Sequence, residues 1–409
     1  MYKLFLIGTS DNSLPAGAQD LVDQCALLVG TNRLQDLVKN FAGRRISITP
    51  LAAAFKDIKE VLGRGNAAVL ASGDPLFYGI GKRILEEFDE NMVEIHPALS
   101  AIQRAAARFK IPWDDGKIIS LHGRNHNHIP GLLLSHPKTF VFTDQTNSPD
   151  TLAARILNYL QDIQYSEFAE KLTVRVAEDL DLDSEKIFRG SLAEAAERSF
   201  SSLNIFCLAL GDGTQAATEN KNFEFGLTED EISHSRGLIT KNEVRAITLH
   251  SLRLPRTGVF WDVGGGSGSV SIEAARANPG LSVYTIEHKV EELENIKENI
   301  RRFHCFNVVP VFGRAPEILA DLPAPDRVFI GGSSGGLREI IRVAADHLPE
   351  NGRLVVNGVI QKTTDTAPIA MAECGLSVAQ SHVQVSRSTF ESRENPQQLN
   401  PITVMTGIK

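Results

Sequence analysis

The segment VFWDVGGGSGSVSIEAAR joins a short hydrophobic run directly to a glycine-rich turn and then to a helical pattern. This order is typical of a parallel α/β sheet, in which the backbone N–H groups of the turn and of the helix N-terminus can approach a ligand. Side chains are absent where the approach is closest, because glycine stands at positions 264, 265, 266 and 268. The segment therefore predicts an α/β fold with a ligand site at this turn, or else a packing turn without a ligand.

A carboxylate follows the turn at an informative distance. Glu287 lies 23 residues after Gly264, at the end of the next hydrophobic strand, where it can accept hydrogen bonds from both hydroxyls of a ribose. Nicotinamide dinucleotides and S-adenosylmethionine both contain such a ribose. The spacing Gly264-x-Gly266-x-Gly268 behind the acidic Asp262 favours a ligand with an ammonium group over one with a pyrophosphate. We therefore predict S-adenosylmethionine here and keep a nicotinamide-dependent oxidoreductase as the alternative.

The length of 409 residues suits two or three domains. Strand and helix patterns alternate as far as Leu210, with a helix expected over Arg33–Phe41, and they predict a first α/β domain over residues 1–210. The polar segment 211–226 carries three glycines and predicts a linker. Residues 227–409 form the second predicted domain, with a helix between each pair of its strands and an antiparallel strand pair at its end.

A second glycine-containing loop, ASGDPLFYGIG, follows a buried strand of the first half. The backbone is restricted at Gly73-Asp74-Pro75, and Phe77 and Tyr78 place two aromatic rings in the same loop. A loop at the carboxyl end of a strand can line a ligand crevice. On composition alone it could equally be a structural turn whose aromatic rings belong to the core.

Charge and cysteine content exclude some classes of function. The formal net charge is −8, so binding to nucleic acid or to an anionic membrane has no general electrostatic basis. The hydrophobic run at Leu4–Ile7 is too short for a signal sequence, and no hydrophobic stretch is long enough to span a membrane, so we expect neither. The four cysteines are far apart, without metal or dithiol spacing, which predicts reduced packing residues in a cytoplasmic protein; they are Cys25, Cys207, Cys305 and Cys374.

Several segments carry a resemblance to known families. In the first half, residues 67–81, PALSAIQRAAARFKIPWDD, SLHGR and VFTDQTNSP are similar to the tetrapyrrole methylases. In the second half, LITKNEVRA, the glycine turn, FGRAPE and FIGGSSGGL resemble the C-15 methylase and decarboxylase of corrin synthesis. In this order they resemble the fused precorrin-6Y C(5,15)-methyltransferases (decarboxylating) over nearly the whole chain.

This resemblance implies an α/β fold with a tetrapyrrole methylase unit followed by a Rossmann-like class I methyltransferase sheet that ends in an antiparallel hairpin. It also implies methylation of a precorrin-6 type corrin precursor in cobalamin biosynthesis, with one S-adenosylmethionine per domain. Residues 1–210 would methylate C-5, and residues 227–409 would methylate C-15 and decarboxylate the C-12 acetate. The expected partners are the tetrapyrrole substrate and further copies of the chain, and neither nucleic acid nor a membrane. A non-catalytic tetrapyrrole-binding protein stays open as a further alternative.

The resemblance, together with the two loops, predicts the site residues. Those expected to bind the cofactor are Gly8, Gly73, Asp74, Pro75, Thr240, Asp262, Gly264, Gly265, Gly266, Ser267, Gly268, Glu287, Gly313, Arg314 and Ala315. Those expected to bind the substrate are Phe77, Tyr78, Gly331, Gly332 and Ser333. No catalytic acid or base is predicted, because methyl transfer to an electron-rich carbon depends mainly on orientation.

Two further groups of residues are weaker candidates. Arginines could hold the carboxylates of a corrin precursor, although most surface arginines are solvated or paired; the candidates are Arg104, Arg108, Arg124, Arg387 and Arg393. Histidines cluster around SLHGRNHNHIPG, but no carboxylate or thiolate completes a metal-ligand set there, so we predict no metal; they are His122, His126, His128 and His136.

Overall fold

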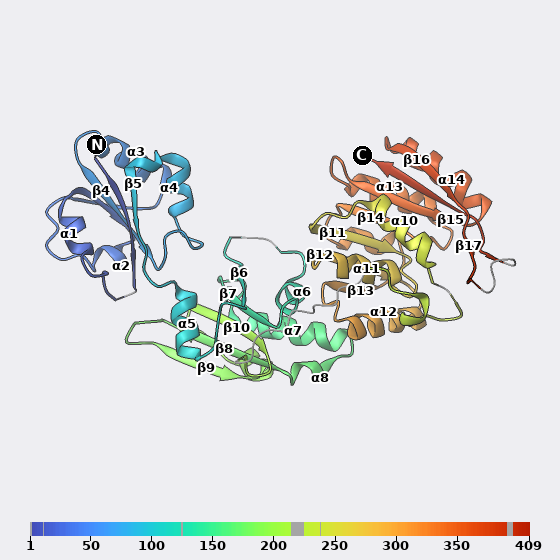
Figure 1. Ribbon diagram of the computed structural model, residues 1–409, viewed down its shortest axis with the longest axis horizontal. Coiled ribbons are helices and arrows are strands. Elements are labelled where there is room, and N and C mark those ends of the chain that lie inside the picture. The colour runs from blue at the N-terminus through green and yellow to red at the C-terminus, as the bar shows by residue number, and fades with distance from the viewer. Residues whose placement is uncertain (1, 11, 124–125, 214–224, 238, 391–395) are drawn as a thin grey trace. The chain divides into compact units, whose positions relative to one another are not determined.

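The chain folds into two compact units in the computed structural model (Figure 1), which describes residues 2–10, 12–123, 126–213, 225–237, 239–390 and 396–409. Unit 1 comprises Met1–Arg124, Lys138–Ala153 and Lys171–Ala217. Unit 2 comprises Asn125–Pro137, Ala154–Glu170 and Thr218–Lys409. Most of the predicted linker, residues 214–224, lies outside the described residues, and the domain boundary at 211–226 stays a prediction.

The first sheet of unit 1 is parallel and has the strand order β3-β2-β4-β1-β5. Its strands are β1 (Leu4–Thr9), β2 (Cys25–Gly30), β3 (Arg44–Ser47), β4 (Asn66–Ser72) and β5 (Val93–His96). Leu4 and Leu6 of β1 pack with α3 and α4 on one face. Phe5 and Ile7 pack with α1 and α2 on the other face. Burial on both faces explains why these strands are continuously hydrophobic; the helices are α1 (Ala18–Asp23), α2 (Asn32–Gln35), α3 (Leu51–Leu62) and α4 (Gly81–Glu87).

The second sheet of unit 1 is mixed and has the order β6-β7-β10-β8-β9. Only β6 and β7 are parallel, whereas β10 runs antiparallel to both of its neighbours. Helix α5 (Ala101–Phe109) begins at the N-cap Ser100 and buries Ile102 and Phe109 against Phe140 and Cys207. The strands are β6 (Lys117–Ser120), β7 (Lys138–Phe142), β8 (Leu172–Glu178), β9 (Lys186–Gly190) and β10 (Asn204–Leu210), and the short helix α9 (Leu192–Ala196) follows β9.

Unit 2 contains a seven-stranded sheet of order β13-β12-β11-β14-β15-β19-β16. Its first five strands are parallel, and β19 lies antiparallel between β15 and β16, as the end of the sequence predicts. The strands are β11 (Thr257–Val263), β12 (Gly280–Glu287), β13 (Val308–Phe312), β14 (Arg327–Ile330), β15 (Arg353–Gly358), β16 (Ser377–Val383) and β19 (Ile402–Ile408). The short strands β17 (Ser386–Arg387) and β18 (Gln397–Gln398) form a separate pair.

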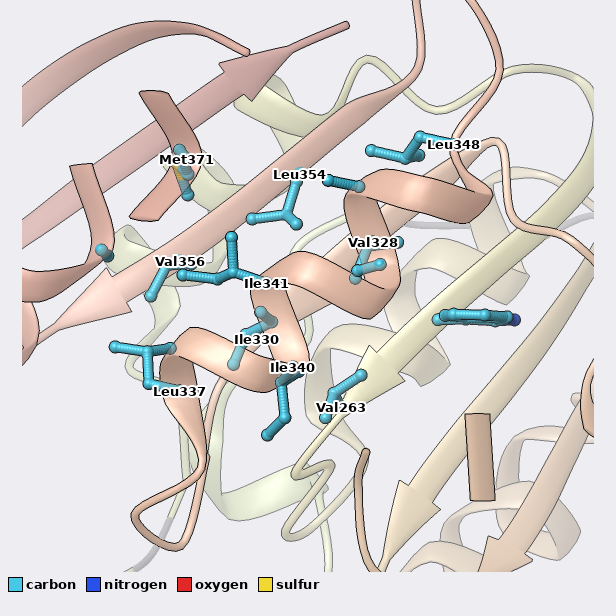
Figure 2. Packing of buried hydrophobic residues seen from close by; sticks show 14 of the residues in the cluster. Val263, Val328, Ile330, Leu337, Ile340, Ile341, Leu348, Leu354, Val356 and Met371 are labelled. Carbon is cyan, nitrogen blue, oxygen red and sulfur yellow. The ribbon is translucent and has the colours of Figure 1, made fainter. Parts of the chain in front are cut away.

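Helices cover both faces of this sheet. A cluster of buried hydrophobic residues joins one face of the sheet to α13 and α14. Figure 2 shows Leu337, Ile340 and Ile341 of α13 against Ile330 of β14 and Val356 of β15. Helices α10, α11 and α12 contact further strands of the sheet. The bounds of the helices of unit 2 are α6 (Ile129–Leu134), α7 (Pro149–Asp162, from residue 154 on), α8 (Ser166–Ala169), α10 (Asn242–Leu252), α11 (Ser269–Ala277), α12 (Val290–Phe303), α13 (Leu337–His347) and α14 (Gln361–Glu373).

Two predicted helices differ from the structure. The helix predicted over Arg33–Phe41 is wrong beyond Gln35, because the chain turns away and reaches a left-handed backbone at Asn40. Between β13 and β14 only the 3-10 helix η3 (Glu317–Asp321) forms, since Pro316 precedes it and Pro323 follows, which leaves too few residues for an α-helix. Within the described residues, no helix is long and apolar enough to cross a membrane.

Candidate cofactor and substrate sites

The glycine turn between β11 and α11 lies against the turn that follows β14. Gly264, Gly266 and Gly268 have φ angles of 72°, 54° and 73°, which L side chains rarely adopt. A Cβ at Gly264 would lie 2.5 Å from the carbonyl oxygen of Gly332. Glycine is therefore required both for the backbone angles and for the close approach of the two turns.

Glu287 ends β12 and faces this turn with a buried carboxylate, 5% exposed. Its Oε2 accepts the backbone N–H of Gly266 at 3.0 Å. Its Oε1 accepts the backbone N–H groups of His288 at 2.8 Å and Lys289 at 3.0 Å. These three bonds hold the carboxylate in one place, so a negative charge is fixed beside the glycine turn.

A cavity of about 150 Å³ opens between the turn, the end of β12 and the turns after β13 and β14. Eight predicted residues line it: Gly264, Gly266, Glu287, Gly313, Arg314, Ala315, Gly332 and Ser333. Seven lining residues were not predicted: Val263, Ile286, His288, Lys289, Glu292, Ser334 and Ile340. His288 and Lys289 directly follow β12, and Ser334 lies in the turn after β14, which is the signal that could have identified these three.

Six predicted residues of unit 2 do not line this cavity: Thr240, Asp262, Gly265, Ser267, Gly268 and Gly331. Asp262 is buried behind the turn, where its Oδ2 accepts the hydroxyl of Ser271 at 2.6 Å. Burial raises the pKa of Asp262 to about 6. Thr240 accepts a hydrogen bond from Arg245 at its carbonyl oxygen, at 3.0 Å. These residues shape the surroundings of the cavity, and their predicted contact with a cofactor stays a prediction.

Unit 1 has a larger cavity of about 690 Å³ between the loop after β4, the N-terminus of α5 and the mixed sheet. The predicted residues Asp74, Phe77 and Tyr78 line it. The rings of Phe77 and Tyr78 are 5.1 Å apart, and Phe142 of β7 lies 6.1 Å and 5.5 Å from them between ring centroids. Phe142 was not predicted, because only the folded sheet brings it to this loop.

Gly8, Gly73 and Pro75 do not line that cavity. A Cβ at Gly8 would lie 2.6 Å from the backbone nitrogen of Ala98 and 3.1 Å from Cδ of Pro75. The backbone N–H of Gly73 donates to the carbonyl of Thr9 at 2.7 Å. The two glycines thus let the loop after β4 lie directly over the end of β1, while their predicted role in binding a cofactor stays a prediction.

Cationic side chains outnumber acids in the lining of the unit 1 cavity, where Lys82, Arg83 and Arg104 accompany Asp74, the single acid among the lining residues. Arg104 forms a buried ion pair with Asp181 at 2.5 Å. Arg108 lies outside the lining and pairs with Asp181 at 3.1 Å and with Glu185 at 2.7 Å. The hydrogen bond from Arg108 lowers the pKa of Glu185. Lys82 and Arg83 were missed, although they continue the predicted loop.

The other candidate arginine that the structure describes is paired. Arg387 of β17 lies 2.6 Å from both Glu229 and Glu243, and its hydrogen bond to Glu243 is the main cause that raises the pKa of Arg387. Arg124 and Arg393 lie outside the described residues.

The candidate histidines lie in different surroundings. His122 lines the unit 1 cavity, and Nε2 of His128 donates to the carbonyl of Phe306 at 3.0 Å. Burial lowers the pKa of His128 to about 4, so this imidazole is neutral at pH 7. His126 and His136 are half-buried. No group of three or more potential metal ligands gathers in the part of the chain that the structure describes.

Known proteins resemble both parts of the chain. The family model of tetrapyrrole (corrin/porphyrin) methylases matches residues 5–196, and that of the precorrin methyltransferase domain matches residues 231–403. A precorrin-6Y C(5,15)-methyltransferase [decarboxylating] of Sinorhizobium sp is 31% identical over 361 residues, which cover 87% of this chain and 82% of that protein. A probable cobalt-precorrin-6B C(15)-methyltransferase (decarboxylating) of Pyrobaculum calidifontis is 37% identical over 186 residues, which cover 44% of this chain and 95% of that protein.

Among solved structures, a precorrin-6y C5,15-methyltransferase from Geobacter metallireducens is 39% identical. The match covers 45% of this chain and 97% of that one, with a TM-score of 0.44. The sequence identity to the Sinorhizobium protein, sustained over most of both chains, is what decides the assignment. This chain belongs to the family of precorrin-6Y C(5,15)-methyltransferases (decarboxylating).

Proposed function

We propose that this chain methylates a corrin precursor at C-5 and C-15 with S-adenosylmethionine and removes the carboxyl group of its C-12 acetate. The observation that carries the proposal is that each unit has its own cavity beside the carboxyl end of a parallel strand. The cavity of unit 2 surrounds a fixed carboxylate, and that of unit 1 combines aromatic and cationic side chains. Two methyl transfers at distant carbons suit two separate sites.

The residues of unit 2 fit the cofactor chemically. Glu287 offers a buried carboxylate to a ribose, and the turn at Gly264 and Gly266 leaves its backbone open to the cavity. S-adenosylmethionine would supply a methyl group on a sulfonium centre. The chain supplies orientation: the turn and Glu287 hold the donor, and the turn at Gly332 and Ser333 faces the acceptor carbon.

Apolar side chains surround the same edge of the unit 2 sheet. Phe312 is the last residue of β13, Val290 follows β12 within a few residues, and Val359 and Ile360 follow β15 directly. All four are more than half exposed. Exposed apolar side chains next to a ligand cavity are typical of a binding surface. They would contact the face of the macrocycle and exclude water from it.

The unit 1 cavity fits a polycarboxylate ring. The aromatic rings of Phe77, Tyr78 and Phe142 can pack on a conjugated macrocycle. Lys82 and Arg83 line the same cavity, and their distances to Glu86, 3.9 Å and 3.6 Å, are too long for strong competing pairs. These cations would hold the carboxylates of the substrate.

We further propose that unit 1 methylates C-5 and that unit 2 methylates C-15 and decarboxylates the acetate. C-12 and C-15 border one pyrrole ring and its neighbouring bridge, so a single bound pose can present both, whereas C-5 lies across the macrocycle. Loss of CO₂ leaves its electron pair in the conjugated ring system, which acts as the electron sink. The methylene carbon that is left takes up one proton to become a methyl group, and because water can supply that proton we assign no side chain as its donor.

Mass spectrometry of the products tests this division in the full chain. With precursor and S-adenosylmethionine, the unaltered chain should add two methyl groups and release one CO₂. Gly266→Val should leave a product with one added methyl and an intact acetate, because a β-branched side chain fills the unit 2 turn. A Gly266→Val chain that still decarboxylates would contradict the assignment.

Calorimetry tests the cofactor and the number of sites. We expect the full chain to bind two equivalents of S-adenosylhomocysteine and no NADH. Binding of only one equivalent of S-adenosylhomocysteine per chain would contradict the proposal of one site per unit. Binding of NADH at the turn that contains Gly266 would favour an oxidoreductase instead.

A further inference from the structure

Glu287 has limited capacity to bind a ribose. Its Oε1 already accepts two backbone N–H groups, from His288 and Lys289, and the ring nitrogen Nδ1 of His288 lies 3.1 Å from the same oxygen. Its Oε2 accepts one N–H, from Gly266. A carboxylate oxygen has about two acceptor positions, so only one position on Oε2 is left. A ribose diol donates two hydroxyl groups, and one of them therefore needs another acceptor.

Glu292 offers that acceptor. It lies in the first turn of α12, is only 4% exposed, and lines the same cavity as Glu287. Its Oε2 accepts the side-chain amide of Asn295 at 3.2 Å, and the same amide donates to the hydroxyl of Ser235 at 2.8 Å. Its Oε1 has no hydrogen-bond partner among the described residues. A buried carboxylate with one uncommitted oxygen is costly unless a ligand completes its hydrogen bonds.

We infer that Glu292 accepts one hydroxyl of the cofactor ribose in unit 2 while Glu287 accepts the other. The inference rests on the proposed function, because it assigns a further residue to the cofactor cavity. Lys289 and Arg314 line the same cavity and offset the second negative charge. The ribose would thus be held between two carboxylates from the end of β12 and the start of α12.

A structural role for Glu292 is the competing explanation. Acidic side chains in the first turn of a helix interact favourably with the helix dipole, whatever they bind. Glu291 shares this position in α12, but it is exposed and its ion-pair partner Arg236 is 3.8 Å away. Glu291→Gln is therefore the matched control for Glu292→Gln. The glutamine at 292 keeps an oxygen for Asn295, so the fold should be retained.

The experiment is calorimetric titration of the full chain with S-adenosylhomocysteine and with its 2′-deoxy and 3′-deoxy analogues. The titration curve should contain one binding event, or component, for each unit, and the component that Gly266→Val removes is assigned to the unit 2 cavity. Glu292→Gln should weaken that component about 10- to 100-fold, the range for a hydrogen bond to a charged group. One deoxy analogue, which lacks the hydroxyl that Glu292 binds, should bind the Glu292→Gln chain as tightly as the parent compound does. Glu291→Gln should change affinity less than twofold.

The outcomes separate this inference from the proposal on which it rests. If Gly266→Val removes a component but Glu292→Gln leaves its affinity unchanged, Glu292 is not a ribose ligand. The same conclusion follows if both deoxy analogues bind Glu292→Gln more weakly than S-adenosylhomocysteine does, by the same factors as in the parent chain. Glu292 would then only stabilise the helix and would not bind a ribose hydroxyl. If no component depends on Gly266, the cofactor does not bind in this cavity, which overturns both.

Discussion

The Cα of Gly264 stands so close to Gly332 that any Cβ at position 264 would lie 2.5 Å from the Gly332 carbonyl oxygen. The turns after β11 and β14 are consequently in direct backbone contact on one wall of the cavity. This contact fixes the distance between the turn expected to hold the donor and the turn expected to face the acceptor. Substitutions that separate the two turns should therefore affect binding as well as stability.

Gly264→Ala tests this contact. Placing an alanine at a positive φ costs roughly 1 kcal/mol by itself. We expect Gly264→Ala to lower the free energy of unfolding by more than this, because the backbone of the Gly332 turn must also move. It should also weaken S-adenosylhomocysteine binding in unit 2. Gly375→Ala is the matched control, since φ is 77° there but a Cβ would have no neighbour within 4 Å. Equal unfolding free energies for the two variants in urea titrations would contradict the prediction.

Glu287→Ala should weaken cofactor binding in unit 2 by about 1.5–3 kcal/mol, because it removes a charged acceptor. Gly266→Val should do more, since a branched side chain both fills the approach path and opposes a φ of 54°. Calorimetry with S-adenosylhomocysteine measures both effects. Unchanged affinity in both variants would show that the turn is only structural.

Asp262 should make the stability of unit 2 fall with rising pH. Burial raises its pKa to about 6 from the ordinary 3.8, so the folded state favours the neutral acid. The stabilisation is complete below about pH 4 and is lost as the pH rises through about 6, with a total on the order of 3 kcal/mol. Asp262→Asn cannot ionise and keeps an acceptor for Ser271, so it should lack this loss.

Urea unfolding of both proteins between pH 4 and pH 7 checks this difference. The neutral, half-buried His128 has the opposite dependence, because its lowered pKa removes stability as the pH falls from 6.5 towards 4. It is present in both proteins and cancels in the comparison. A difference between Asp262→Asn and the parent that stays constant with pH would refute the role of Asp262.

Tyr159→Phe should destabilise unit 2 by about 1–3 kcal/mol. The buried hydroxyl of Tyr159 donates to the carbonyl of Val308 at 2.8 Å, and its loss leaves that carbonyl without this partner. Tyr165→Phe is the control, because the Tyr165 hydroxyl is exposed and lies 3.4 Å from the ring of His304. Thermal unfolding should separate the two variants, and similar melting temperatures would count against the prediction.

Separate expression of residues 1–210 and 227–409 tests the predicted boundary. We expect both fragments to be soluble and to melt cooperatively. The second should melt below unit 2 of the full chain, because it lacks Phe168, whose ring centroid is 5.0 Å from that of Phe306. Aggregation of both fragments would argue against a boundary within 211–226.

Local patterns predicted much of the fold. Leu293, Ile296, Ile300 and Phe303 recur at helical spacing, and all four lie in α12. Local spacing does not predict whether a strand runs parallel or antiparallel to its neighbours, because that depends on strands far away in the chain. The hydrophobic run at 203–210 is typical of a strand, but nothing in it shows that β10 runs antiparallel to β7 and β8.

In the candidate sites, too, the residues set by local sequence were predicted and those set by the folded structure were not. The glycine turn and Glu287 could be predicted because they are close in sequence to the strands that position them. Asp262 was placed in the site, but side chains alternate along a strand, so Val263 lines the cavity while Asp262 points to Ser271 of α11. Glu292 was missed, since an acid at the start of a helix has an ordinary structural explanation.

The position of β19 also bears on how the protein is made. This strand follows β16 in the chain, yet it lies inside the sheet, between β15 and β16. During synthesis β16 leaves the ribosome first and has no neighbour to pair with until β19 follows. Unit 2 therefore completes its sheet only after Ile408 has left the ribosome, and a nascent chain stalled short of Ile402 would present the open edges of β15 and β16 to chaperones and to other chains.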